Sequence, residues 1–258
     1  MVAGVHVLSL RLLGPFGAYD VNRSQPVSIS CRRARALLAY LAMHPDRVID
    51  REELSDLLWD VRKGRDTRHN LRQCLVDLRK ALDAFPGLLT IERDAVSLNS
   101  QLCQVDALQF ADLVEAGDLD RATTLHHGEF LKGLNIPAEA FAVWVGNERV
   151  RLSTIAEHLF EKTVQSSMSS GDGKKVIAAA EKLVALDPLH ENWQRLLIDA
   201  YARFRGRHTA IMHARKFIES LKRDLDVAPE PETLALLDQI RIGSIKPLLH
   251  VDSQPIAG

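Results

Sequence analysis

The stretch from residue 66 to residue 82 constrains the fold more than any other, because its apolar residues follow a helical spacing. Five apolar side chains recur every three or four positions, so they line one face of a helix. These are Leu71, Cys74, Leu75, Leu78 and Leu82. A helix with a single apolar stripe buries that stripe against a core and turns its other faces to solvent. The stretch therefore predicts an amphipathic helix that packs on neighbouring elements.

The other faces of this predicted helix carry hydrogen-bonding and basic side chains. Between residues 62 and 80, seven Lys and Arg residues stand against two Asp residues, in a chain whose formal net charge is −1. An apolar back, a hydrogen-bonding front and arginine edges suit the major groove of double-stranded DNA. On this helix alone, an ordinary amphipathic helix with a solvated basic face fits equally well.

Short β-strands are expected ahead of this helix. Residues 5–12 alternate in part between apolar and polar side chains, begin with β-branched residues and stop at a Gly-Pro pair, which is typical of a strand. Residues 18–21 and 27–30 are weaker strand candidates, and turn residues separate them. A small N-terminal sheet is the result.

Two further helices and a hairpin flank the basic helix. The helix expected from residue 32 to 44 opens with three arginines, and the next opens at Asp50, whose side chain is expected to cap the N–H near Glu53. After the basic helix, apolar runs at 88–91 and 96–98 predict a β-hairpin. A sheet, three helices and a hairpin in this order predict a winged helix-turn-helix, with the hairpin as the wing.

From Asp106 onward, helix follows helix. Gly171 and Gly206 lie 35 residues apart, and each precedes a helix with small residues in register. Those small residues are Ala178, Ala179, Ala210 and Ala214. A period near 34 is typical of tetratricopeptide-type helical hairpins, in which small residues let antiparallel helices approach closely.

The predicted fold class is therefore mainly α. An N-terminal α+β winged helix-turn-helix is followed by an all-α, tetratricopeptide-like helical superhelix. We expect a winged-helix domain at residues 1–104 and an all-α domain at 105–242. Residues 243–258 mix Pro, Gly, Ser and isolated apolar residues, so they are expected to form a flexible tail or a truncated linker.

Charge, cysteine usage and hydropathy narrow the cellular setting. Residues 1–105 hold 15 Lys and Arg against 12 Asp and Glu, so the front of the chain is mildly basic. Three widely spaced cysteines fit free thiols in a reducing compartment. No apolar run approaches the roughly 18 residues of a membrane span, and the N-terminus lacks the pattern of a signal peptide. We expect a cytoplasmic protein of a prokaryote, without membrane contact.

Motifs for catalysis, cofactor binding and metal binding are missing from the sequence. It contains no Gly-rich phosphate loop, no Gly-x-Ser-x-Gly and no paired cysteine ligands. The histidines at 126–127 and those at 208 and 213 lack metal-ligand spacing on one helix face. We therefore expect no enzyme activity and no catalytic, cofactor-binding or metal-binding residues.

Seven stretches together follow the pattern of one family. They are residues 10–16, 35–41, 48–59, 71–82, 106–110, 186–191 and 226–233. In these stretches the chain, over roughly residues 1–242, resembles the SARP-type transcriptional activators, which pair a response-regulator-type winged helix with a bacterial transcriptional activation domain. The resemblance implies sequence-specific binding to double-stranded promoter DNA and recruitment of RNA polymerase. Binding to DNA repeats by two protomers would add self-association on DNA.

Side-chain chemistry divides the work of such a DNA contact. Gln73 can pair with adenine and Arg72 with guanine through two hydrogen bonds each, and Val76 can contact a thymine methyl group. His69 and Lys80 could reach base edges or phosphates. The phosphate contacts expected are Arg65, Arg68 and Arg79, with some of Arg32, Arg33 and Arg35. Arg93, at the tip of the wing, is expected in the minor groove.

The sequence also departs from the family. The wing has Ala95-Val96 where the family often has Gly-Tyr, and the basic helix has His69, Arg72 and Gln73 where small residues or Thr are common. The DNA target therefore cannot be taken from a relative.

Two other functions stay open at this point. A helical-repeat adaptor with a degenerate winged helix would bind no specific DNA site. Alternatively, the chain is the regulatory front end of a longer sensor or enzyme, with the remaining part beyond Gly258.

Overall fold

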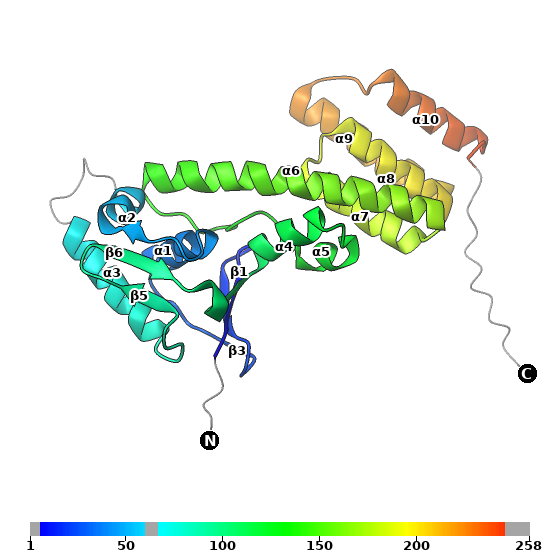
Figure 1. Ribbon diagram of the computed structural model, residues 1–258. Coiled ribbons are helices and arrows are strands. Elements are labelled where there is room, and N and C mark those ends of the chain that lie inside the picture. Colours follow the sequence, from blue (N-terminus) through cyan, green and yellow to red (C-terminus); the bar gives the residue numbers. More distant parts are fainter. Residues whose placement is uncertain (1–5, 60–66, 246–258) are drawn as a thin grey trace, which may run out of the picture. The chain divides into compact units, whose positions relative to one another are not determined.

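A four-stranded sheet lies at the start of the fold. The computed structural model describes residues 6–59 and 67–245 (Figure 1). The strands are β1 (Leu8–Arg11), β2 (Gly17–Asp20), β3 (Gln25–Pro26) and β7 (Cys103–Val105), in the order β3-β2-β1-β7. β1 is antiparallel to β2 and parallel to β7. Leu8 and Leu10 are fully buried, so this sheet has one face on the core.

One of the two weaker strand predictions is wrong. β2 confirms the prediction at residues 18–21, but residues 27–30 lie outside the strands. The N–H of Val27 still donates to the carbonyl of Ala18 at 2.8 Å. The chain then leaves the sheet, because the buried Ile29 packs into the core and its carbonyl accepts a hydrogen bond from Arg35.

Three helices and a second sheet complete the winged helix. The helices are α1 (Arg32–Met43), α2 (Arg51–Leu58) and α3 (Thr67–Ala81). The sheet contains β4 (Ile49–Asp50), β5 (Leu89–Ile91) and β6 (Ala95–Leu98) in the order β4-β6-β5. The antiparallel pair β5–β6 confirms the predicted hairpin. β4 joins this hairpin to the start of α2, so the wing and the helix-turn-helix form one framework.

The predicted capping box at the start of α2 is wrong. Asp50 is the N-cap residue, but its side chain makes no capping hydrogen bond. Glu53 instead accepts hydrogen bonds from the hydroxyl of Tyr40 at 2.8 Å and from Arg47 at 3.0 Å. Because the backbone of Asp50 pairs with Ala95 in the wing sheet, tertiary contacts fix the start of this helix in place of a local cap.

Asp106 ties the first helix after the winged helix to β1. Its carboxylate accepts the backbone N–H of Leu12 at 2.7 Å and that of Leu13 at 3.0 Å. Burial raises the pKa of the Asp106 carboxyl, and these backbone donors oppose that rise. α4 (Asp106–Glu115) and α5 (Leu119–Leu125) thus belong to the first of two compact units, residues 1–155 and 156–258. The domain boundary predicted at residue 104 stays a prediction.

Between residues 139 and 242, five helices follow one another with short connections. They are α6 (Glu139–Ser170), α7 (Gly173–Leu186), α8 (Glu191–Phe204), α9 (Arg207–Leu225) and α10 (Pro231–Ile242). α7 packs on α8, and α8 packs on α9. The connections of two to five residues favour antiparallel neighbours. This arrangement and the winged helix confirm the predicted fold class.

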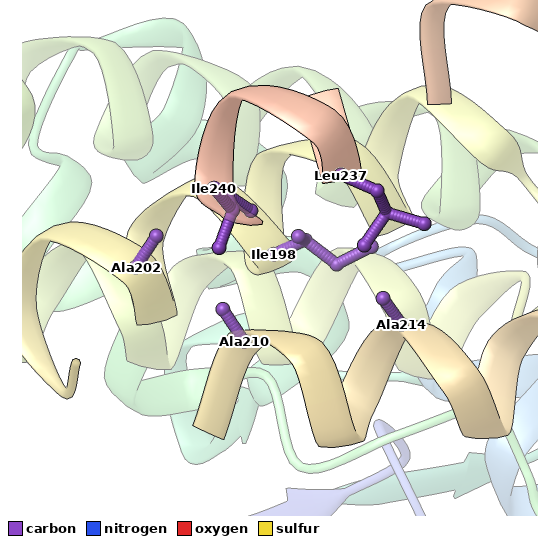
Figure 2. Packing of buried hydrophobic residues seen from close by; sticks show 6 residues of the cluster. All are labelled: Ile198, Ala202, Ala210, Ala214, Leu237 and Ile240. Atoms are coloured by element: carbon purple, nitrogen blue, oxygen red, sulfur yellow. The ribbon is translucent and has the colours of Figure 1, made fainter. Parts of the chain in front are cut away.

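Small residues let α8, α9 and α10 pack closely in the second unit. Figure 2 shows the alanine side chains facing Ile198, Leu237 and Ile240 in one buried cluster. Those alanines are Ala202 of α8 with Ala210 and Ala214 of α9. In α7 the register differs from the expected one, because Ala178 is exposed whereas Ala179 is buried.

A glycine at the first position of α7 permits a close approach to α8. Gly173 is buried, and a Cβ added to it would overlap the ring of Phe204. We expect Gly173→Ala to lower the free energy of unfolding by about 1–3 kcal/mol, as overpacking of a core does. Urea denaturation followed by circular dichroism measures this change.

The matched control is Gly146→Ala in α6, where an added Cβ would meet nothing within 4 Å beyond its chain neighbours and the backbone of its own helix. Because alanine favours a helix over glycine, this variant should be as stable as the parent or more so. Equal losses in the two variants, or no loss in Gly173→Ala, would contradict the overlap with Phe204.

Candidate nucleic-acid interface

The apolar stripe of α3 is buried as predicted. Leu71, Cys74, Leu75, Leu78 and Leu82 are each at most 4% exposed. α1 and α2 both pack against α3. Burial raises the pKa of the Cys74 thiol to about 12, so this cysteine is protonated at neutral pH and acts as a core residue. The stripe therefore fixes which face of α3 points outward.

The outward face of α3 carries the predicted base-reading and phosphate-binding residues. The exposed ones are Arg68, His69, Arg72, Gln73, Val76, Arg79 and Lys80. At about 100° per residue, His69, Gln73, Val76 and Lys80 lie opposite the buried stripe. The three arginines all fall on one edge of this face, which we call the arginine edge (Arg68, Arg72 and Arg79). The helix thus presents a hydrogen-bonding front with positive charge concentrated on one side.

The wing places Arg93 at its tip. Arg93 is exposed in the turn between β5 and β6, where the N–H of Glu92 donates to the carbonyl of Ala95 at 3.0 Å. Its sequence neighbours Glu92 and Asp94 are acidic and exposed as well. The tip therefore presents one arginine between two carboxylates.

The three early arginines have different environments. Arg32, the first residue of α1, is exposed. Arg33 is half-buried, lies over the ring of Trp59 and donates to the carbonyl of Leu58 at 3.3 Å. Arg35 is half-buried too and donates to the carbonyl of Ile29 at 2.5 Å. Arg33 and Arg35 thus hold α1 to neighbouring backbone, while Arg32 faces solvent.

Arg65 lies outside the described residues. On α3, Nε2 of Gln73 donates a hydrogen bond to Oδ1 of Asp77 at 3.1 Å, a contact that was not predicted. The spacing of four residues places such a pair on neighbouring helical turns, so the signal was present in the sequence.

The described residues show neither a metal site nor a membrane-spanning helix. Within 6–59 and 67–245, no group of three or more His, Cys, Asp or Glu side chains is placed to hold a metal ion. No helix in the same ranges combines the length and hydropathy that crossing a bilayer requires.

Comparisons with known proteins bear on both parts of the chain. The family model described as "Bacterial transcriptional activator domain" matches residues 105–241. The model described as "Transcriptional regulatory protein, C terminal" matches residues 25–93. That second match contains α1, α2, α3 and β5, and so includes the exposed face of α3. A search of curated proteins found no significant match.

A solved structure with a similar fold is that of Mycobacterium tuberculosis EmbR in complex with a low affinity phosphopeptide. The two proteins are 22% identical with a TM-score of 0.59. The match covers 94% of this chain and 66% of the EmbR chain, so this chain spans just under two thirds of that protein's length. At this identity the likeness supports the fold.

Proposed function

We propose that this chain, which belongs to the bacterial transcriptional activator domain family, is a DNA-binding transcriptional activator that binds repeats in promoter DNA and recruits RNA polymerase. The observation that carries the proposal is the exposed face of α3. It joins hydrogen-bonding side chains, an apolar contact residue and the arginine edge on a helix whose buried stripe fixes its orientation. Such a helix fits the major groove of DNA.

The proposed contacts follow from side-chain chemistry and exposure. Gln73 and Arg72 pair with bases through two hydrogen bonds each, and Val76 contacts a thymine methyl group. His69 and Lys80 reach base edges or phosphates. The remaining arginines of the arginine edge, Arg68 and Arg79, bind phosphates and set the affinity and its dependence on salt.

Other basic residues take secondary parts in the proposal. Arg32 is the early arginine best exposed for a phosphate, because Arg33 and Arg35 donate to backbone carbonyls of their own fold. Arg65 remains a phosphate contact proposed from the sequence. Arg93 enters the minor groove from the wing, with affinity reduced by its acidic neighbours.

The two family matches support a division of labour along the chain. We propose that residues 1–104 bind DNA and that residues 105–242 contact RNA polymerase, with residues 243–258 as a tail or linker. Two protomers on neighbouring repeats would associate on the DNA. The protein would act in the cytoplasm, in contact with nucleic acid and without membrane contact. Both matched families are transcriptional-regulator domains, so the proposed activity needs no catalytic residues and no cofactor.

Footprinting tests this function directly. The whole chain is incubated with DNA upstream of neighbouring genes, in parallel with Gln73→Ala and Arg72→Ala. We expect a protected repeat that weakens in both variants. Gln165→Ala, an exposed glutamine on α6, is the matched control and should leave the footprint unchanged.

Two further results complete this test. Diffuse binding that neither variant changes would contradict the proposal and favour a protein-interaction adaptor. Transcription in vitro from the protected promoter, with purified RNA polymerase, tests recruitment separately. We expect the chain to increase the transcript yield only when the protected repeat is present.

A further inference from the structure

The hydrogen bond between Gln73 and Asp77 lies on the helix face that the proposed function places in the major groove. Nε2 of Gln73 lies 3.1 Å from Oδ1 of Asp77, one helical turn further along. Gln73 is exposed and Asp77 is half-buried. Between residues 67 and 81, Asp77 is the single acidic residue in the sequence. Its position on the helix is on the side away from the arginine edge.

The chemistry of this pair fixes the orientation of the glutamine. An ionised carboxylate accepts hydrogen bonds and donates none, whereas a glutamine amide has one accepting oxygen and one donating NH₂ group. The NH₂ group of Gln73 must therefore face Asp77, and Oε1 must point away from it. With one N–H given to Asp77, the amide keeps its second N–H and Oε1 for another partner.

An adenine base needs that remaining pair of groups. In the major groove, adenine presents N7 as an acceptor and its N6 amino group as a donor. The second N–H of Gln73 can donate to N7 while Oε1 accepts from N6. A flipped amide would place the NH₂ group of Gln73 against the N6 amino group and Oε1 against N7, so neither hydrogen bond could form. The Asp77 contact therefore selects, before DNA arrives, the orientation that matches adenine.

We infer that Asp77 is a positioning residue, which orients the Gln73 amide so that Gln73 reads one adenine in the DNA site. The inference rests on the proposed function, because it assumes that α3 enters the major groove. An acidic side chain on this helix repels phosphates and so weakens binding to all DNA. Asp77 thus lowers general affinity while it raises the selectivity of its neighbour for one base.

Selection from a random DNA library, with the whole chain as bait, tests the inference. For Asp77→Ala we expect the preference for adenine at one position to fall about 5- to 10-fold, within the discrimination that a two-bond base contact supplies. Affinity for unselected DNA should rise up to about threefold, since a negative charge is lost. Asp77→Glu, which keeps a carboxylate four residues from Gln73, should restore most of the adenine preference.

Two further variants separate positioning from other effects. Asp83→Ala removes an equal charge from an exposed position just after α3, so it should raise general affinity without changing base preference. In the double variant Gln73→Ala/Asp77→Ala, the preference should equal that of Gln73→Ala alone, because Asp77 acts only through Gln73.

A measurement without DNA reports on the contact itself. The side-chain NH₂ signals of Gln73 in the nitrogen–proton NMR spectrum are identified by their loss in Gln73→Ala. We expect these signals to shift in Asp77→Ala and to stay in place in Asp83→Ala. If the wild-type protein selects a motif but the Gln73 signals do not shift in Asp77→Ala, the positioning role is overturned and the proposed function stays intact.

The remaining outcomes are equally decisive. Asp77→Ala could instead change the preference at a different base position, and the double variant Gln73→Ala/Asp77→Ala could show the same change. That result would show that Asp77 reads a base itself and would overturn the inference. Unchanged selection in Asp77→Ala would overturn it too. If the wild-type chain selects no motif at all, the proposed function fails and the inference falls with it.

Discussion

Arg72→Glu is expected to lower the affinity of the chain for its DNA site at least about 100-fold near 0.15 M salt, which is about 2.7 kcal/mol. The substitution removes a two-bond contact to guanine, and a contact of this kind supplies about 1–3 kcal/mol of discrimination. It also puts a carboxylate on the arginine edge, where it repels phosphates. Arg72 is exposed on α3, so the change should leave the fold intact.

Fluorescence anisotropy with a labelled DNA site measures this loss across a range of salt concentrations. The dependence of affinity on salt should become shallower, because fewer counterions are released on binding. Arg215→Glu makes the same charge change at an exposed position of α9 and serves as the control. Equal losses in the two variants would mean that net charge alone drives binding. If Arg72→Glu bound the DNA site with wild-type affinity, the assignment of α3 as the helix that reads DNA would be wrong.

The helical elements could be predicted because their signals are local. In α3, the spacing of Leu71, Leu75 and Leu78 sets the buried stripe without knowledge of the partner elements. The breaks around Gly171 and Gly206 similarly mark the ends of helices, and both residues have positive φ angles. The hairpin was also predictable, since its two strands lie only a few residues apart.

Features that depend on distant contacts were missed. β7 pairs with β1 across more than ninety residues of chain, because Leu8 lies beside Cys103. The sequence near either strand does not indicate this pairing. Asp50 follows the pattern of a capping residue, yet its backbone pairs with Ala95 and its expected partner Glu53 bonds to Tyr40. In these places tertiary contacts override a local preference.

In the candidate site too, features set by one helix could be predicted, and features set by contacts between elements could not. A helical wheel suffices to put Gln73 and Lys80 opposite the buried stripe, because the stripe itself fixes the orientation of α3. The roles of Arg33 and Arg35 depend on carbonyls of other elements, so sequence alone could not separate them from Arg32. The sequence predicts which charged side chains are exposed where a single helix determines their exposure. It predicts this poorly where side chains lie between several elements.

The start of α10 depends on a hydrogen-bond network around Glu191, the first residue of α8. The Glu191 carboxylate accepts the backbone N–H of Glu230 at 3.0 Å and the hydroxyl of Thr233 at 2.6 Å. Arg195 donates to Glu230 at 2.7 Å and to the Thr233 hydroxyl at 3.0 Å. Thr233 is fully buried, so its hydroxyl depends on these partners.

We expect Glu191→Ala to destabilise the docking of α10 by about 2–3 kcal/mol. Hydrogen bonds to a charged group contribute about 1.5–3 kcal/mol each, and partial exposure of Glu191 reduces their combined effect. Hydrogen exchange of the backbone amides measures the change segment by segment. Protection should fall first in residues 233–242, because the start of α10 loses its hydrogen bonds to Glu191 while the apolar cluster that contains Ile198 and Ala214 remains.

Two control variants make this expectation specific to the network. Glu219→Ala removes an exposed carboxylate from α9 and should leave the exchange of α10 unchanged. Glu191→Gln keeps an accepting oxygen but loses the charge, so it should recover part of the protection. Unaltered exchange in Glu191→Ala would mean that the apolar cluster of α8, α9 and α10 holds the last helix by itself. α10 lies in the region that we propose contacts RNA polymerase. If the network holds α10 in place, Glu191→Ala should reduce transcription activation and leave the footprint on DNA unchanged.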